Sequence, residues 1–102
     1  MTAKNDNPNI TIGDATPIMN VLSDDMSCDE SANDARAKSG WLALMSYTGK
    51  AYGAPAPEPV EQGIRDLLGD LQHTCHCLGL DFDELVERAT NTFQEELEFP
   101  LG

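Results

Sequence analysis

The clearest hydrophobic pattern lies in the C-terminal half of the chain. Between residues 58 and 78, apolar side chains recur mostly at steps of three or four, which places them on one face of a helix. They are Val60, Ile64, Leu67, Leu68, Leu71, Cys75 and Leu78. Pro59 suits the first turn of such a helix, and Gly79 is typical of its C-terminal end. The pattern therefore predicts a helix from about residue 58 to residue 78.

A second amphipathic pattern follows almost at once. Asp81 is a typical N-cap residue, and Glu84 stands three positions later, where it completes a capping box. The apolar positions of this segment are Phe82, Leu85, Val86, Ala89, Phe93 and Leu97. Because Gly79 and Leu80 leave almost no loop, the two helices are predicted to form an αα-hairpin over residues 58–98. Two such helices bury too little area to fold alone, so the hairpin needs another segment, a second copy or a partner.

The N-terminal half has a weaker pattern. Acidic residues after Ser27 or Asp29 favour a helical segment over residues 29–48, with Gly40 as an expected interruption. Trp41 begins the only dense apolar run of this half and is expected to pack into the core. Three prolines stand at alternate positions between residues 53 and 59, and because proline lacks a backbone donor we expect 53–59 to form an extended linker.

Residues 1–22 show no sustained period and are predicted to form an irregular, flexible arm. Within that arm, the alternation over residues 9–12 is compatible with a short edge strand. Residues 23–102 are then expected to form a single small helical domain. The predicted fold class is thus mostly all-α.

Charge and cysteine content narrow the classes of function. The chain has 102 residues, with 18 acidic against 6 basic side chains and a net charge of −12. Such a chain repels phosphate, so we expect no direct binding of nucleic acid, and a charge-driven partner should be basic. No stretch is long and apolar enough to span a membrane, no signal peptide is evident, and three cysteines fit a reducing compartment. These features predict a soluble, cytoplasmic protein.

A His-Thr-Cys-His-Cys sequence over residues 73–77 suggests a zinc site at first sight. Zinc requires four converging ligands, whereas a helix points Cys75 inward and His76 elsewhere. His73 and Cys77 share one face and form at most half a site, which Cys28 or a second copy would have to complete. We therefore expect no metal and no cofactor, with Cys75 as a small core residue.

The same region has a partial resemblance to the all-α NTP pyrophosphatases, in which an acidic helix leads through a Gly-Leu-Asp turn into another helix. That family has a Glu-x-x-Glu pair on a preceding helix and a Glu-x-x-Asp pair on this one. Here Asp66 and Asp70 are four apart, and Glu58 and Glu61 begin the same helix. Without four converging carboxylates a magnesium site for a triphosphate is not formed. We therefore expect no catalytic residues, and we rank a metal-dependent hydrolase of this kind as the second alternative, behind the two non-enzymatic functions given below.

The acidic residues themselves are the strongest candidate for a functional surface. Residues 58–102 contain eleven acids and two bases, against seven acids and four bases in residues 1–57. The candidate partner-binding residues are Asp83, Glu84, Glu87, Glu95 and Glu98 on the last helix, with Asp66 and Asp70 as a second row. A row of carboxylates can serve solubility alone, or it can occupy a groove that is built to hold phosphates.

The segments over residues 64–73, 79–85 and 93–96 resemble the C-terminal helical hairpin of small proteins of phages and mobile elements, over about 35 residues. Small acidic phage proteins include anti-CRISPR and other inhibitors that mimic nucleic acid. The hairpin resemblance itself implies no particular chemistry. By analogy in size and charge with these inhibitors, the leading expectation is a non-enzymatic inhibitor that acts in the cytoplasm of a host cell. It would use its acidic surface against a nucleic-acid-binding defence complex, such as a CRISPR effector. The first alternative is a small dimeric helical adaptor or regulator that binds a partner helix, and a homodimer is compatible with either function.

Overall fold

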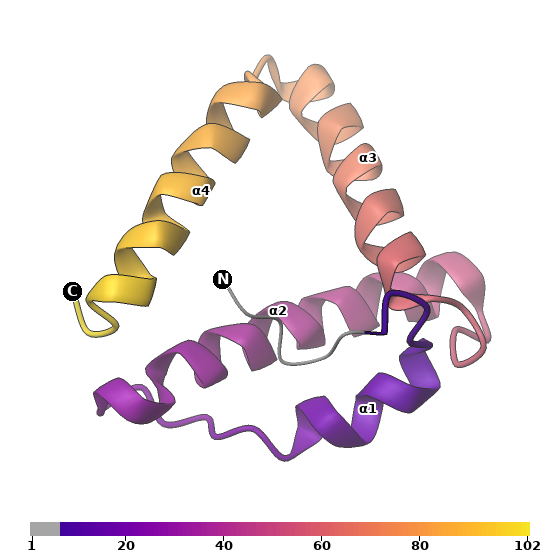
Figure 1. Ribbon diagram of the computed structural model, residues 1–102. Coiled ribbons are helices and arrows are strands. Elements are labelled where there is room, and N and C mark those ends of the chain that lie inside the picture. The colour runs from indigo at the N-terminus through magenta and orange to yellow at the C-terminus, as the bar shows by residue number, and fades with distance from the viewer. Residues whose placement is uncertain (1–6) are drawn as a thin grey trace.

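The computed structural model describes residues 7–102, which form four helices and no strand. The helices are α1 (Ile12–Asn20), α2 (Asp29–Tyr52), α3 (Val60–Leu78) and α4 (Phe82–Glu98). Figure 1 shows α2 as the base of a triangle, with α3 and α4 as its other two sides and α1 lying along α2. The all-α fold class predicted from the sequence is confirmed. Residues 1–6, which belong to the predicted arm, lie outside the described residues.

The prediction of an irregular arm over residues 1–22 is wrong for residues 12–20, because these form α1. Thr11 caps the helix, since its Oγ1 accepts a hydrogen bond from the backbone N–H of Asp14 at 3.1 Å. Ile12 and Ala15 are buried in the core, and Met19 packs against it. The steps of three and four between these residues are a helical signal, but nine residues are too few for that signal to stand out.

Backbone hydrogen bonds fasten the start of α1 to the proline-rich linker. The N–H of Ile12 donates to the carbonyl of Glu58 at 2.9 Å, and the N–H of Val60 donates to the carbonyl of Ile10 at 3.0 Å. Thr11 and Pro59 thereby form an isolated antiparallel bridge, which is all that the strand-like pattern of residues 9–12 produces. Residues 53–59 connect α2 to α3 but are not extended throughout, because the N–H of Glu58 donates to the carbonyl of Pro55 at 2.9 Å and closes a turn. The segment is held against the entry to α1.

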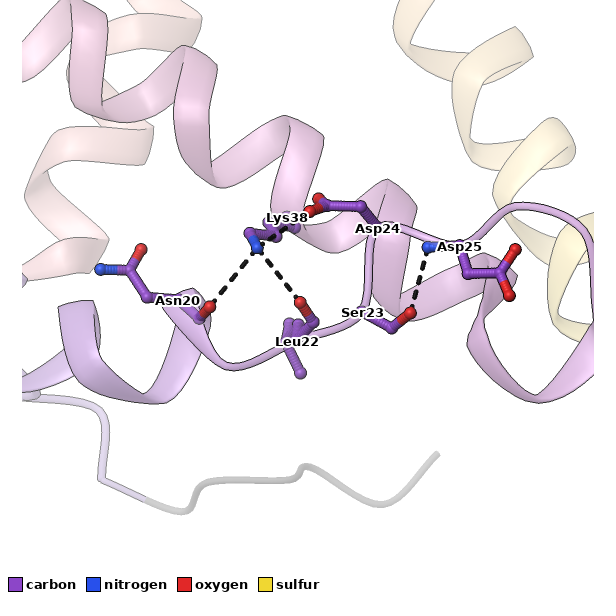
Figure 2. A network of polar contacts seen from close by, with 6 residues as sticks. All are labelled: Asn20, Leu22, Ser23, Asp24, Asp25 and Lys38. Atoms are coloured by element: carbon purple, nitrogen blue, oxygen red, sulfur yellow. Dashed lines mark hydrogen bonds and ion pairs between the residues drawn. The ribbon is translucent and has the colours of Figure 1, made fainter.

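Lys38 on α2 holds the other end of α1. Its Nζ donates to the backbone carbonyls of Asn20 at 3.4 Å and Leu22 at 3.2 Å, and it pairs with Asp24 at 3.2 Å (Figure 2). These carbonyls lie at or just after the C-terminus of α1, where the helix offers no further donors. A cation at that place also interacts favourably with the helix dipole. α1 is therefore tied down at both ends.

The helix α2 is longer than predicted and runs without interruption through Gly40. A single glycine costs a helix about 1 kcal/mol, which packing on either side can offset. Trp41 and Leu44 supply that packing, because both are buried in the cluster with Ile12 and Ala15. The expectation that Trp41 joins the core is confirmed. The helix ends at Gly53, whose φ of 75° reverses the chain toward the linker.

The first half of α3 packs closely on α2. Gly63 is buried, and a Cβ atom placed on it would lie 3.1 Å from Cγ2 of Thr48 and 3.5 Å from Cδ1 of Leu44. Thr48 itself has no exposed surface. The absence of a side chain at position 63 thus allows the two helices to approach.

The predicted hairpin is confirmed in its elements and its turn. Gly79 ends α3 with a φ of 72°, and Asp81 caps α4 by accepting a hydrogen bond from the N–H of Glu84 at 3.1 Å. The two helices nevertheless diverge from the turn (Figure 1). The far end of α4 returns to α2, where Arg36 pairs with Glu96 at 2.6 Å and Asn33 donates to the carbonyl of Glu96 at 2.8 Å.

The packing of α3 on α2 can be tested by two matched glycine substitutions. Gly63→Gln is expected to lower the free energy of unfolding by about 1–3 kcal/mol, because the new side chain has no room beside Thr48. At Gly69 in the same helix an added Cβ atom would meet nothing within 4 Å, so Gly69→Gln is expected to raise the free energy of unfolding by about 0.5–1 kcal/mol through helix propensity. Urea denaturation followed by circular dichroism measures both. Equal effects of the two variants would contradict the packing described.

Candidate functional site

Five of the predicted partner-binding residues lie together on one side of α4. We call Asp83, Glu84, Glu87, Glu95 and Glu98 the acidic face. At 100° per residue they occupy an arc opposite Phe82, Val86 and Phe93. All five are exposed. The structure therefore brings these residues to one surface, as the sequence predicted.

Few basic side chains of the same chain neutralise the carboxylates of the acidic face. Within the described part of the chain, Asp83, Glu87, Glu95 and Glu98 form no side-chain hydrogen bond and no ion pair. Glu84 lies 3.9 Å from Arg88, the one basic residue of α4, and both side chains are largely exposed. A pair of this kind contributes about 0.5 kcal/mol at most. The acidic face is thus free to bind cations.

Asp66 and Asp70 lie elsewhere, against α2. Oδ2 of Asp66 accepts a hydrogen bond from the hydroxyl of Tyr52 at 2.5 Å, and Oδ2 of Asp70 accepts one from the hydroxyl of Tyr47 at 2.5 Å. These two aspartates therefore join α3 to α2 and do not extend the acidic face. Nothing in the spacing of the tyrosines along the sequence indicates these pairs, which depend on how the helices dock.

The same contacts change the acidity of both phenols. The hydrogen bond to Asp70, with loss of solvent and the nearby charge of Asp66 adding to it, raises the pKa of Tyr47 to about 12. The hydrogen bond to Asp66 likewise raises the pKa of Tyr52. Each carboxylate stabilises the protonated phenol because it would repel a phenolate.

The cysteine and histidine cluster remains dispersed. Cys75 is buried, as predicted, whereas His73, His76 and Cys77 are exposed. Cys28 lies at the start of α2, with its Sγ 3.0 Å from Oγ of Ser31. Over residues 7–102, no three side chains of the His, Cys, Asp or Glu type converge into a set that could hold a metal ion. The geometry thus assigns no ligand set to these residues or to Asp66 and Asp70.

An extensive apolar surface follows both arms of the triangle. We call the following residues the α3–α4 apolar face: Leu68, Leu71, Leu78, Leu85, Val86, Phe93 and Leu97. Each is more than 40% exposed, although its position on the helix matches the core-facing stripe expected from the sequence. No residue of α4 is buried. The sequence predicted that the hairpin needs a further surface to close its core, and the described chain does not supply it.

An apolar groove continues this surface between α1, α2 and the first half of α3. It has a volume of about 620 Å³. Its lining includes Ile18 and Met19 from α1, Trp41 from α2, and Ile64 and Leu67 from α3. Ile64 and Leu67 belong to the same helical stripe as Leu68 and Leu71, so the groove and the α3–α4 apolar face are parts of one surface.

Comparison of the chain with protein-family models, curated proteins and solved structures gives no match. Among the described residues, no helix is long and apolar enough to cross a membrane.

The tyrosine pairs lead to a prediction about pH. Because the pKa of Tyr47 is raised from 10 to about 12 in the folded chain, its contact with Asp70 stabilises the fold fully below pH 10. That contribution is lost as the pH rises from 10 toward 12. A titration of tyrosinate absorbance, with circular dichroism recorded in parallel, should show one phenol ionising near pH 12.

Asp70→Asn should lower the pKa of Tyr47 toward its ordinary value, because an amide does not repel the phenolate. Asp83→Asn, on the acidic face, removes an equal charge far from both tyrosines and should leave the titration unchanged. Ordinary titration of both phenols in the unmodified chain would contradict the arrangement of α2 and α3.

Proposed function

We propose that the protein is a non-enzymatic binding protein whose acidic face engages a basic surface on another protein, one that otherwise holds nucleic acid. The observation that carries this proposal is the exposed row of carboxylates on α4 with almost no compensating charge. Such a row attracts cationic side chains and repels nucleic acid itself.

The spacing of the carboxylates supports a phosphate-like role. At 1.5 Å per residue, the acidic face extends over roughly 22 Å and carries about one charge per 5 Å. A single nucleic-acid strand carries about one charge per 3.4 Å. Asp83, Glu84 and Glu87 form one group, and Glu95 and Glu98 form another about 12 Å along the axis. A groove lined with lysine and arginine for a phosphate backbone can accept charges at this density.

The position of the second group argues against a role in helix stability. Glu95 and Glu98 lie in the last turn of α4, which contains no basic residue. Carboxylates at a helix C-terminus oppose the dipole and cost about 0.3–1 kcal/mol each. Acidic residues that serve only solubility can stand anywhere on the surface. Their presence where they weaken the helix favours a binding role.

Within this proposal, the partner is a nucleic-acid-binding complex such as a CRISPR effector, and the protein is a phage-type inhibitor that competes with its nucleic acid. This identification rests on an analogy, since the chain shares its small size and strong negative charge with phage inhibitors that mimic nucleic acid. Opposite fields would steer the two molecules together and make association fast and sensitive to salt.

The proposal can be tested by competition. A purified CRISPR effector complex is first bound to fluorescently labelled target DNA, and the protein is then added while anisotropy is recorded. We expect displacement of the DNA at low salt, weakening by at least about tenfold between low and moderate salt. The quadruple variant D83N/E87Q/E95Q/E98Q should lose displacement by a similar factor or more.

The matched control removes four charges from other surfaces. Asp14→Asn, Asp29→Asn, Glu30→Gln and Glu61→Gln, combined in one chain, give the same net charge as the α4 variant. This control should displace DNA almost as well as the unmodified protein. If both variants lost displacement equally, the effect would depend on net charge alone. If displacement of DNA did not change with salt concentration, the acidic face would be excluded as the binding surface.

A further inference from the structure

The acidic face uses one side of α4, and the opposite side is apolar and uncovered. Phe93 is 43% exposed, Val86 is 42% exposed and Leu71 on the facing arm of α3 is 43% exposed. In a soluble chain, single exposed apolar residues are ordinary, whereas a continuous apolar stripe along two helices marks an interaction site.

The accessible surface of the chain shows how much is left uncovered. It measures 7246 Å², whereas a folded monomer of 11.1 kDa is expected to expose about 5,700 Å². The excess is roughly 1,600 Å², and leaving out residues 1–6 with the largest surface that six residues can have lowers it to no less than roughly 900 Å². Two chains that covered this excess against each other would bury roughly 1,800–3,200 Å². This range runs from a standard specific interface to an obligate homodimer interface.

Charge is arranged so that two copies can meet along this face. At −12 per chain, two copies repel each other wherever their acids approach. On α4, however, the acids lie on the opposite arc, and the one acid within the apolar arc is Glu96. Glu96 is held by Arg36 of α2 at 2.6 Å. The α3–α4 apolar face itself contains no charged residue, so contact through it keeps the carboxylates of both copies in solvent.

We propose that a second copy of this chain covers the α3–α4 apolar face. The apolar sides of α3 and α4 in one copy pack against those of the other copy about a two-fold axis, so that four diverging helices form one open bundle. Such packing supplies the closing surface that the open hairpin lacks. The core around Trp41 stays within each chain and lies outside the bundle.

The dimer has a consequence for the acidic face, although it does not depend on the function proposed above. Because the acidic and apolar arcs are opposite, both acidic faces point away from the bundle. One particle then presents two identical acidic surfaces. Binding through both surfaces at once would raise the apparent affinity without any new contact, provided that a partner offers two basic grooves at a suitable distance.

Sedimentation equilibrium of the full chain tests the assembly directly. The expected mass is twice the chain mass of 11.1 kDa, and thermal unfolding should shift to higher temperature as protein concentration rises. Added sodium chloride should leave the dimer intact or tighten it, since salt screens the repulsion between two anionic chains. The same salt should weaken binding through the acidic face, so failure of one proposal is distinguishable from failure of the other.

A matched pair of variants locates the interface. Phe93→Asp places a charge within the α3–α4 apolar face and should weaken dimerisation by at least about thirtyfold. Asn91→Asp adds the same charge on the opposite arc of α4 and should leave the dimer unchanged. Leu71→Glu and Gln72→Glu form the corresponding pair on α3.

Each outcome has a definite meaning. Phe93 is 43% exposed in the single chain, so dissociation of a Phe93→Asp variant that keeps its helix content supports the dimer, whereas loss of helix in a Phe93→Asp monomer at concentrations where the unmodified chain is also monomeric counts against it. A monomeric mass of the unmodified chain at high micromolar concentration overturns the proposal. A Phe93→Asp variant that still dimerises overturns the assignment of the interface, as does higher assembly in place of a dimer.

Discussion

The rest of the structure depends on the docking of α1 and the first half of α3 against Trp41 and Leu44 of α2. This contact buries the central apolar cluster of the described chain, while backbone bonds to the linker hold the start of α1 and the Lys38 side chain holds its end. Burial of apolar surface is the main force that orders a chain of this size. The second half of α3 and all of α4 extend away from this contact, and the rest of the chain covers few of their apolar side chains.

That uneven distribution of burial explains the shape. A chain of about a hundred residues has few large apolar side chains. Here many of them lie on the second half of α3 and on α4 instead of in the central cluster. Polar contacts from Arg36 and Asn33 to Glu96 close the triangle, but such exposed contacts stabilise only modestly. The second half of α3 and all of α4 therefore remain amphipathic helices whose apolar sides are available for association.

The helix α4 combines two surfaces of opposite character. Its carboxylates are exposed on one arc, and Phe93 with its neighbours occupies the other. A helix with 3.6 residues per turn separates the two automatically, so a single element can contact a basic partner and an apolar one at the same time. The steric and electrostatic demands of the two contacts do not conflict, because each uses a different side.

By itself, the sequence determined the two C-terminal helices, the turn at Gly79, the cap at Asp81 and the placement of the acidic face, because these follow from periodicity and local chemistry. It did not reveal α1, the continuity of α2 through Gly40, or the pairing of Tyr47 with Asp70. Those features depend on contacts between residues distant in sequence, and such packing overrides local propensity. Tertiary structure also decided that the α3–α4 hairpin is open, since α3 docks on α2 at one end while Glu96 of α4 is bonded to Arg36 and Asn33 of α2 at the other.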